Sequence, residues 1–328
     1  TNSGNSWLLQ SSGAANSLSS VFFINSETGI AVGSGGTILK TSNGGLNWTQ
    51  KPSGTSYWLQ SVFFTDLDHG FIVGPGGLLL KTINGGDTWL EQSLGTSSQF
   101  NEIFFYGANF GTIVGSGGKI YRTTNGGSSW YLQFSGISSD LYSVCFKDVN
   151  YGFAVGYDAI IYTTNSGWNW FACNSGVTNR FFSSVCIQDQ NNVTVVGNSG
   201  IIIHSSDGGI TWKKQRSGTI NNLQSVFFTN SNTGTTVGQY STILKTTTSG
   251  VVPVELISFT ALNINKSIQL SWSTATELNN RGFEIERSFD KDKWRIIGYK
   301  EGKGTTSEPQ SYTYIDDISE ISADKLYY

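Results

Sequence analysis

The sequence predicts an all-β protein built from repeated four-stranded units, and two periodic features of its 328 residues carry this prediction. One is a box of the form Thr/Ser-x-Asn/Asp-x-Gly-x-Asn/Thr/Ser-Trp, whose complete copies begin at Thr41, Thr82, Thr123, Thr163 and Ser205. The other is a glycine that recurs every 41 residues, at Gly33, Gly74, Gly115, Gly156, Gly197 and Gly238. A period of about 40 residues that holds four short strands is typical of the blade of a β-propeller.

Each unit is expected to contain four strands, which in the first complete unit span residues 18–24, 28–33, 37–41 and 47–51. Short apolar runs flank each box, and a strand, an Asn/Gly-rich turn and a second strand form a hairpin. In the turn, the Asn or Asp side chain can bind its own backbone and Gly can adopt a positive φ, while the Trp offers an apolar surface for burial. These structural positions are Asn43, Gly45, Trp48, Asn84, Gly86, Trp89, Asn125, Gly127, Trp130, Asn165, Gly167, Trp170, Asp207, Gly209 and Trp212.

The number of units follows from the two incomplete ends of the repeat. Residues 2–7 form a box that lacks its first position, and the strand Trp7-Leu8-Leu9-Gln10 follows it. At the other end, Pro253 stands where the last box should have its Trp. If the N-terminal strand completes the last unit, residues 1–250 form a six-bladed propeller whose ring hides its own ends. Seven blades are the alternative.

A second module is expected after residue 250, where the period stops. Short alternating segments at residues 252–259, 267–273, 282–288, 294–298 and 310–316 are separated by turn residues, which is typical of a β-sandwich. Residues 251–328 would lack the last strand of such a sandwich, so we expect the natural protein to continue. The sequence also contains no methionine, and we expect the start of the gene product, such as a signal peptide, to be missing.

Both modules resemble known families. The box resembles the Asp-box of sialidase-type and BNR-repeat propellers, and the whole unit is most similar to propellers related to the photosystem II assembly and stability factor. Pro253-Val254-Glu255-Leu256, Leu270-Ser271-Trp272 and Gly282-Phe283-Glu284-Ile285-Glu286-Arg287-Ser288 resemble the fibronectin type III-like module near the C-terminus of type IX-secreted surface proteins. This second resemblance implies export across a bacterial outer membrane, to the cell surface or the medium.

The composition excludes several classes of partner. Charged residues are 13% of the chain and the net charge is −3, so there is no electrostatic footprint for nucleic acid. No apolar run approaches the roughly 20 residues that span a bilayer. No spacing of Cys and His suggests a metal site, and no cofactor is expected.

The sequence offers little for catalysis. Of its two histidines, His204 occupies the slot that holds Lys40 and Lys81 in other units, so it is expected on the surface rim. Sialidases of similar fold use an arginine cluster, whereas the propeller here has only Arg122, Arg180 and Arg216. Glycosidases need two opposed carboxylates, and the turns already explain the acidic residues. A glycoside-active enzyme is therefore the least favoured alternative, and we expect no enzymatic activity.

One face of the propeller is the candidate for binding. The loops that join fourth to first strands should share a face with those that join second to third strands. This face would carry Tyr57, Trp58, Asp140, Tyr157, Asp158, Arg180, Phe181 and Tyr240, at positions that vary between units. Exposed aromatic side chains with a few polar groups mark binding surfaces, although these rings could instead pack against neighbouring loops. We expect a surface-attached binding protein for a protein or a glycan. A self-assembling structural subunit of an extracellular appendage is the alternative.

Overall fold

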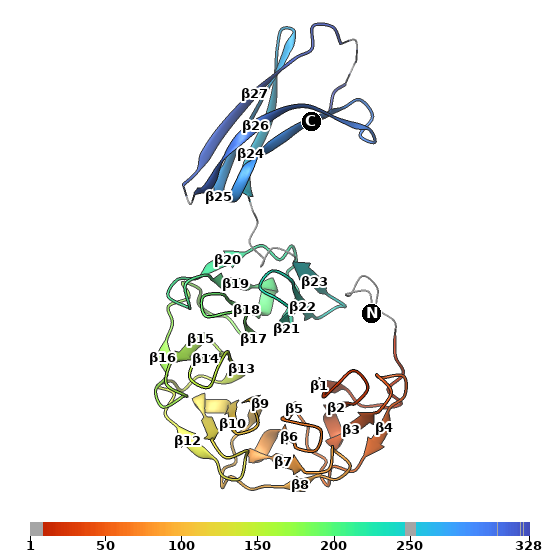
Figure 1. Ribbon diagram of the computed structural model, residues 1–328, viewed down its shortest axis with the longest axis vertical. Coiled ribbons are helices and arrows are strands. Elements are labelled where there is room, and N and C mark those ends of the chain that lie inside the picture. The colour runs from red at the N-terminus through yellow and green to blue at the C-terminus, as the bar shows by residue number, and fades with distance from the viewer. Residues whose placement is uncertain (1–8, 247–253, 307, 322, 324) are drawn as a thin grey trace. The chain divides into compact units, whose positions relative to one another are not determined.

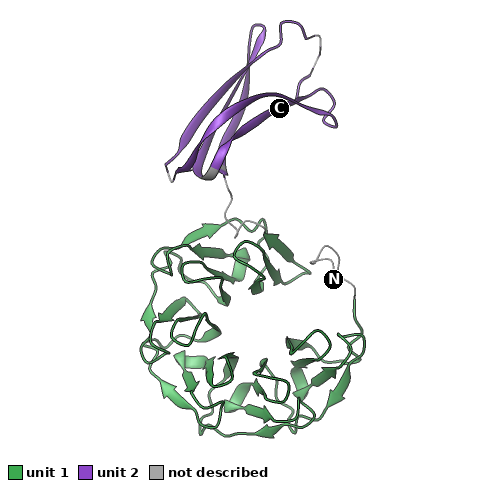
Figure 2. Cartoon of the chain, in the orientation of Figure 1, with its two compact units in different colours: residues 1–247 green, residues 248–328 purple. Residues whose placement is uncertain are grey.

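The computed structural model describes residues 9–246, 254–306, 308–321, 323 and 325–328. The chain divides into two compact units, Thr1–Thr247 and Thr248–Tyr328 (Figure 2). Unit 1 contains the repeats and unit 2 the module that follows them. The division lies close to the boundary expected from the loss of the 41-residue period.

Unit 1 is a ring of small antiparallel sheets, which confirms the predicted all-β propeller fold (Figure 1). Its described residues form five four-stranded sheets and one three-stranded sheet. Sheet 1 consists of β1 (Leu18–Phe23), β2 (Gly29–Gly33), β3 (Ile38–Thr41) and β4 (Thr49–Lys51), in that spatial order. Each of these bounds lies within two residues of the bound predicted from the sequence.

The following sheets repeat this arrangement, and each places its first strand innermost in the ring (Figure 1). Sheets 2 and 3 contain β5 (Ser61–Phe64), β6 (Gly70–Val73), β7 (Leu79–Thr82), β8 (Leu90–Glu91), β9 (Phe100–Tyr106), β10 (Phe110–Gly115), β11 (Ile120–Thr123) and β12 (Tyr131–Gln133). Sheets 4 and 5 contain β13 (Leu141–Phe146), β14 (Gly152–Gly156), β15 (Ala159–Thr163), β16 (Phe171–Ala172), β17 (Phe182–Ile187), β18 (Val193–Gly197), β19 (Ile202–Ser205) and β20 (Lys213–Gln215). Sheet 6 contains β21 (Leu223–Phe228), β22 (Gly234–Gly238) and β23 (Ile243–Thr246).

The box closes the turn between the third and fourth strands through side-chain hydrogen bonds. In sheet 1 the Thr41 hydroxyl donates to Asn43 Oδ1 at 3.0 Å and accepts from the Gly45 amide at 2.9 Å. Asn43 Oδ1 also accepts from the Asn47 amide at 2.9 Å. The equivalent bonds recur in the other four complete boxes. The side chains of the box therefore satisfy the amides that the tight turn leaves unpaired.

The core of the ring lies between adjacent sheets. Five clusters of buried apolar side chains join sheet 1 to 2, 2 to 3, 3 to 4, 4 to 5 and 5 to 6. The box tryptophans pack edge-on against phenylalanine rings, as Trp89 does against Phe64 at 5.9 Å. Trp89 and Trp170 are buried, whereas Trp48, Trp130 and Trp212 are half-buried. The five tryptophans are therefore not equally enclosed.

A repeated hydrogen bond links the innermost strands of neighbouring sheets. The Val62 amide of β5 donates to the Ser20 hydroxyl of β1 at 3.3 Å. The same bond recurs from Ile103 to Ser61, from Val185 to Ser143 and from Val226 to Ser184. Between sheets 3 and 4 the acceptor is a Glu102 carboxylate oxygen instead of a hydroxyl. Apolar packing and one inner hydrogen bond thus define each junction.

The prediction that His204 lies on the surface rim is wrong, because its side chain is only 5% exposed. Its Nδ1 lies 3.0 Å from the Thr194 hydroxyl, and burial lowers the pKa of its imidazole. Arg122 occupies the same slot in sheet 3 and is also 5% exposed. Its guanidinium donates to the Thr112 hydroxyl and to the Val149 carbonyl, both at 3.1 Å. Residues at this position therefore start between the sheets. A longer lysine side chain, such as that of Lys81, extends outward and its Nζ donates to the Gly126 carbonyl.

The expected closing strand lies mostly outside the described residues, which begin at Leu9. Leu9 and Gln10 are described, belong to no strand and are exposed. Among the described residues, sheet 6 therefore has three strands. Six or seven blades thus stay alternatives.

Unit 2 is also built of antiparallel strands, namely β24 (Val254–Ile264), β25 (Ser267–Ser288), β26 (Trp294–Thr306) and β27 (Gln310–Asp317). The first part of β25 pairs with β24 and β27, and its second part pairs with β26. The segments predicted at 267–273 and 282–288 are thus one long strand. Leu270, Trp272, Ile285 and Tyr312 form its core. The fibronectin type III-like assignment stays a prediction.

Candidate functional site

The centre of unit 1 holds a cavity of about 1150 Å³ that the innermost strands line, which we call the axial cavity. Each of the six units contributes one equivalent side chain to this lining: the second residue of β1, β9, β13, β17 and β21, and the residue directly before β5. These side chains are uncharged and can form hydrogen bonds: Ser19, Gln60, Asn101, Tyr142, Ser183 and Gln224. An occupant of this cavity would therefore meet hydroxyl and amide groups rather than fixed charges.

Strand geometry explains why polar residues stand at this position. The pairing of β1 with β2 shifts between Leu18 and Ser20, and the same irregularity occurs in sheets 4, 5 and 6. Such a bulge leaves one residue out of the ladder and re-aims its side chain. Ser19 donates to the Leu59 carbonyl of the next sheet, and Asn101 Nδ2 donates to the Leu141 carbonyl at 2.7 Å. The lining side chains thus also join adjacent sheets.

Glu102 is the one carboxylate among the described residues that line the cavity. It stands where the other units have Ser20, Ser61, Ser143, Ser184 and Ser225. Its Oε2 accepts a hydrogen bond of 2.5 Å from the Val144 amide. Burial raises the pKa of this carboxyl to about 7, although the bond from Val144 opposes the shift. The cavity wall therefore contains one carboxyl whose pKa is raised towards neutral pH by burial.

Three aromatic rings form a cluster between sheets 4 and 5, which we call the aromatic cluster: Tyr142, Tyr157 and Phe181. The rings of Tyr157 and Phe181 lie 4.7 Å apart, and those of Tyr142 and Phe181 lie 6.1 Å apart. Tyr142 and Phe181 also line the axial cavity. Tyr157 and Phe181 remain 40% and 45% exposed. The rings therefore pack on one another and still offer apolar surface to solvent.

The short turn of sheet 4 creates this cluster. In sheet 1 the turn after β2 ends at Gly36, whose φ is +67° and whose amide donates to the Tyr57 carbonyl at 2.8 Å. A Cβ on Gly36 would lie 1.9 Å from the Thr55 carbonyl oxygen, so only glycine fits there. In sheet 4 Asp158 takes the left-handed conformation, at φ +53°, and its amide donates to the Arg180 carbonyl. The sequence change at residues 157–158 thus keeps the backbone contact and adds a side chain on each residue.

The structure brings together five of the eight predicted site residues. Asp140 accepts from the Tyr157 amide through its carbonyl and from the Gly117 amide through Oδ1, at 2.9 and 2.8 Å. Tyr157 in turn pairs with Phe181, and the Asp158 amide donates to the Arg180 carbonyl. Tyr57 and Trp58 belong instead to the loop before β5, and Tyr240 to the loop between β22 and β23. These three are exposed and no described contact joins them to the aromatic cluster.

Sequence reasoning missed the lining of the cavity. Tyr142, Gln60, Asn101, Glu102 and Gln224 were not among the predicted site residues. Alignment of the units would have drawn attention to Glu102, because it replaces a serine that every other unit keeps. The polar lining position at the start of each inner strand was hidden, because an alternating pattern does not reveal a bulge.

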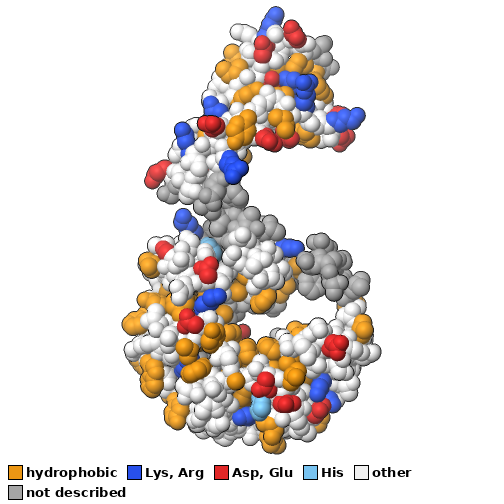
Figure 3. Space-filling model, viewed as in Figure 1, with side chains coloured by type: hydrophobic (Ala, Val, Ile, Leu, Met, Phe, Trp, Pro, Cys, Tyr) orange, Lys and Arg blue, Asp and Glu red, His pale blue; other side chains and the backbone are white. Residues whose placement is uncertain are grey.

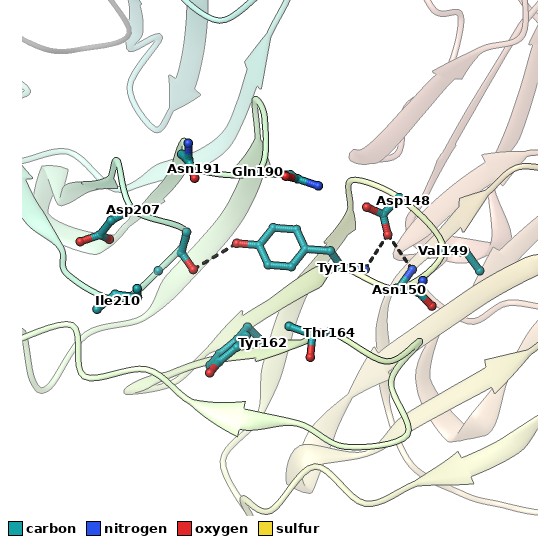
Figure 4. A pocket seen from close by; sticks show the side chains of 12 residues that line it. Asp148, Val149, Asn150, Tyr151, Tyr162, Thr164, Gln190, Asn191, Asp207 and Ile210 are labelled. Atoms are coloured by element: carbon teal, nitrogen blue, oxygen red, sulfur yellow. Dashed lines mark hydrogen bonds between the residues drawn. The ribbon is translucent and has the colours of Figure 1, made fainter.

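A second cavity, of about 690 Å³, lies between the turns of sheets 4 and 5 (Figure 4). It is lined by Asp148, Tyr151 and Asp207, among others. Asp148 Oδ1 accepts from the amides of Asn150 and Tyr151, and the Tyr151 hydroxyl donates to the Gly208 carbonyl at 3.1 Å. Asp207 accepts from the Thr211 amide and hydroxyl, and the bond from the hydroxyl lowers the pKa of its carboxyl. Both carboxylates are thus engaged in holding turns.

Charged and metal-binding groups are sparse around these sites. On the face shown in Figure 3, acidic and basic side chains are scattered over the ring without a cluster of one sign. No group of three His, Cys, Asp or Glu side chains among the described residues could hold a metal ion. The helices that the structure describes include none long and apolar enough to cross a membrane.

Repeated four-stranded sheets closed by an Asp-box turn define unit 1 as a BNR-type β-propeller. The family model for the photosynthesis system II assembly factor YCF48 matches residues 1–137, 53–174, 129–214 and 163–247. The chain belongs to this family, which confirms the resemblance seen in its repeats. No curated protein matched the sequence.

The solved structures with TM-scores above 0.5 show the same fold at low sequence identity. YCF48 from Cyanidioschyzon merolae is 18% identical, with a TM-score of 0.59 over 78% of this chain and 92% of that one. A structure described as YCF48 bound to D1 peptide is 21% identical, with a TM-score of 0.44 over 71% and 92%. The GH74 enzyme of Niastella koreensis is 13% identical, with a TM-score of 0.57 over 89% of this chain and 60% of that one.

Proposed function

We propose that this protein is a non-catalytic binding factor that holds an extended segment of a partner protein at the axial cavity. The observation that carries this proposal is the aromatic cluster, whose half-exposed rings stand at a cavity lined by uncharged amide and hydroxyl groups. Membership of a family of assembly factors supports a protein partner.

The chemistry of the site suits a peptide segment. Side-chain amides both donate and accept hydrogen bonds, as the backbone of an extended segment requires. Gln60, Asn101 and Gln224 supply such groups in the cavity. Rings such as Tyr157 and Phe181 offer broad apolar contact and lose little conformational entropy on binding. The partner segment should therefore be uncharged, with an apolar side chain for the aromatic cluster.

A glycoside hydrolase is the less supported alternative. Glycosidases place two carboxyl groups on either side of the scissile bond, roughly 5 to 9.5 Å apart. Glu102 is the one carboxylate among the described lining residues, and the Val144 amide already binds it. The likeness to GH74 structures concerns the fold, so it supports no reaction here.

We place this factor at the outer surface of a bacterial cell or in the medium, on the resemblance of residues 253–288 to modules of exported surface proteins. Protease treatment of intact cells tests this location. Removal of the protein, with a cytoplasmic marker left intact, is the expected result. Protection until the cells are lysed would contradict it.

The binding proposal is tested by selecting random peptides displayed on phage against the purified chain. We expect the selected peptides to bind the double variant Tyr157→Ala/Phe181→Ala at least about tenfold more weakly, since truncation of central aromatic contacts costs about 1 to 4 kcal/mol. Tyr131→Ala/Phe134→Ala is the matched control, because these exposed rings lie on and just after the outer strand β12.

Three outcomes decide the proposal. Loss of peptide binding in the cluster variant alone supports it. Equal loss in the control, or no loss in either variant, refutes the site. A glycan array run in parallel separates the partner classes, and binding of glycans without peptides would refute a protein partner.

A further inference from the structure

The second cavity of unit 1 is a site that the proposed function does not use, and we call it the turn cavity. It holds about 690 Å³ between the turns of sheets 4 and 5 (Figure 4). Tyr142 of the aromatic cluster lies near the start of β13, whereas Asp148 of the turn cavity follows the end of that strand. The two sites therefore lie at opposite ends of the strands.

The residue directly before each box reaches towards the next sheet, and in sheets 1, 2 and 3 it is a cation. Lys40 Nζ lies 3.1 Å from Asp87 Oδ1 in the box of sheet 2. Lys81 Nζ donates to the Gly126 carbonyl in the box of sheet 3 at 3.3 Å. The Arg122 guanidinium donates to a turn carbonyl of sheet 4 at 3.1 Å. Each of these junctions thus holds a positive charge beside a turn of the following sheet.

Sheet 4 departs from this pattern, because Tyr162 stands directly before its box. A neutral group takes the place of the cation at the next box, since the Tyr151 hydroxyl donates to the Gly208 carbonyl at 3.1 Å, as Lys81 does to the equivalent Gly126. The described residues that line the turn cavity include no Lys, Arg or His. This junction therefore keeps the acceptor of the repeat and lacks its positive charge.

Two carboxylates line the turn cavity without a positive partner. Asp148 and Asp207 form no ion pair with a described residue. Their hydrogen bonds come from amides and hydroxyls, which leave both negative charges in place. Lys147 is close in sequence, but its Nζ donates to the Gln188 carbonyl and it does not line the cavity. In the view of Figure 4 the ring of Tyr151 lies between the two carboxylates.

The ring of Tyr151 offers a face on which a cation can rest. Tyr151 is equivalent to Phe110, because each stands directly before the glycine of its second strand. The guanidinium carbon of Arg122 lies over the Phe110 ring, 5.8 Å from its centroid. A ring face attracts a cation within about 6 Å of its centre. Tyr162, which replaces the cation in sheet 4, instead stacks on Phe153 at 5.9 Å. The position over Tyr151 is thus left to an external group.

We propose that the turn cavity binds an organic cation, carried as an arginine or lysine side chain of a partner protein. Such a side chain supplies the group that sheets 1 to 3 provide from their own chain. Its alkyl stem would lie beside the exposed Ile210, which also lines the cavity. A metal ion fits less well, because the described residues contain no group of three His, Cys, Asp or Glu side chains that could hold one.

The test titrates the isotope-labelled chain with N-acetyl-arginine methylamide and follows the amide signals by NMR. We expect saturable shifts at Tyr151 and Gly208, with a dissociation constant of about 1 mM or below. The matched ligand is N-acetyl-citrulline methylamide, which keeps the shape without the charge and should bind at least about fivefold more weakly. Agmatine, a free guanidinium compound, is titrated in parallel to separate a protein side chain from a small cation.

Variants taken from the repeat itself test the site without disturbing its turns. Asp148→Asn/Asp207→Asn should weaken arginine binding by at least about fivefold, and Asn stands at both positions in other units. The control Asp66→Asn/Asp68→Asn removes the same charge from an exposed turn of sheet 2 and should leave binding unchanged. Tyr162→Lys gives sheet 4 the cation of sheets 1 and 2 and should weaken arginine binding by about tenfold or more, whereas Tyr162→Phe should not.

The outcomes decide between a cation site and an unused space. Charge-dependent binding that both the Asp148/Asp207 pair and Tyr162→Lys weaken supports the proposal. Equal binding of the citrulline ligand, no saturation by either ligand, or an equal loss in the control pair overturns it. Agmatine bound about tenfold more tightly than the arginine ligand would overturn the assignment to a protein side chain. Tyr157→Ala/Phe181→Ala should leave arginine binding unchanged, so failure of the axial site and failure of the turn cavity are distinguishable.

Discussion

Replacing Glu102 by Gln should stabilise the propeller unit at alkaline pH and leave its stability at pH 5 almost unchanged. Burial raises the pKa of this carboxyl from 4.5 to about 7, so between these values the folded chain holds a proton that the unfolded chain has released. Stability linked to the group is therefore fully present below pH 4.5 and is lost as pH rises through about 7. A shift of this size corresponds to roughly 3 kcal/mol, and the open side of the cavity reduces the expected effect to about 1 to 3 kcal/mol.

Urea denaturation at pH 5, 6, 7 and 8 measures this effect as the difference in unfolding free energy between the variant and the unchanged chain. Gln keeps an oxygen that can accept the Val144 amide, so the hydrogen bond is preserved while the charge is removed. The exposed Glu91 provides the control, since Glu91→Gln should leave the pH profile unchanged. Parallel profiles for Glu102→Gln and the unchanged chain would refute the assignment of a protonated carboxyl to the cavity wall.

Two further pairs of substitutions test how the sheets are held together. Trp89→Ala should cost roughly 3 to 5 kcal/mol of unfolding free energy, because it empties a buried aromatic site between sheets 1 and 2. Trp48→Ala should cost about 1 kcal/mol, because that ring is half-buried and contacts the exposed Phe23. Equal costs in thermal denaturation would show that the two sites are equally enclosed. The unfolding free energy of Arg122→Met should stay within about 1 kcal/mol of that of the unchanged chain, because an apolar side chain of similar volume can replace a buried charge. Arg122→Ala should lower the unfolding free energy by about 3 kcal/mol, because it leaves a void. A larger loss for Met than for Ala would contradict this.

The repeated elements were predictable because local chemistry determines them. The turn of each box is fixed by residues four or fewer positions apart, such as Thr41, Asn43 and Gly45, so the sequence pattern and the hydrogen bonds coincide. The strand bounds of sheet 1 were predictable for the same reason. The glycine positions that mark turns also require positive φ or close approach, as Gly36 does.

The features that were missed depend on contacts between units. Arg122 and His204 share a slot with lysines in the sequence, but their burial depends on how neighbouring sheets close over that slot. Tyr142 joined the aromatic cluster because a bulge in β13 turns its side chain towards the cavity, and alternation of polar and apolar residues contains no sign of a bulge. The long strand β25 appeared as two segments because residues 274–281 lack the apolar alternation of a strand.

The inner hydrogen bonds between sheets have a consequence for how the ring is made. Each bond joins residues 42 positions apart, as Ser20 and Val62 are, and none of the five requires the far end of the chain. A newly synthesised chain can therefore add its sheets one at a time, each docking on the sheet before it. Loss or gain of one whole unit by gene duplication would disturb only two neighbours. The number of sheets is thus free to change during evolution without redesign of the junction.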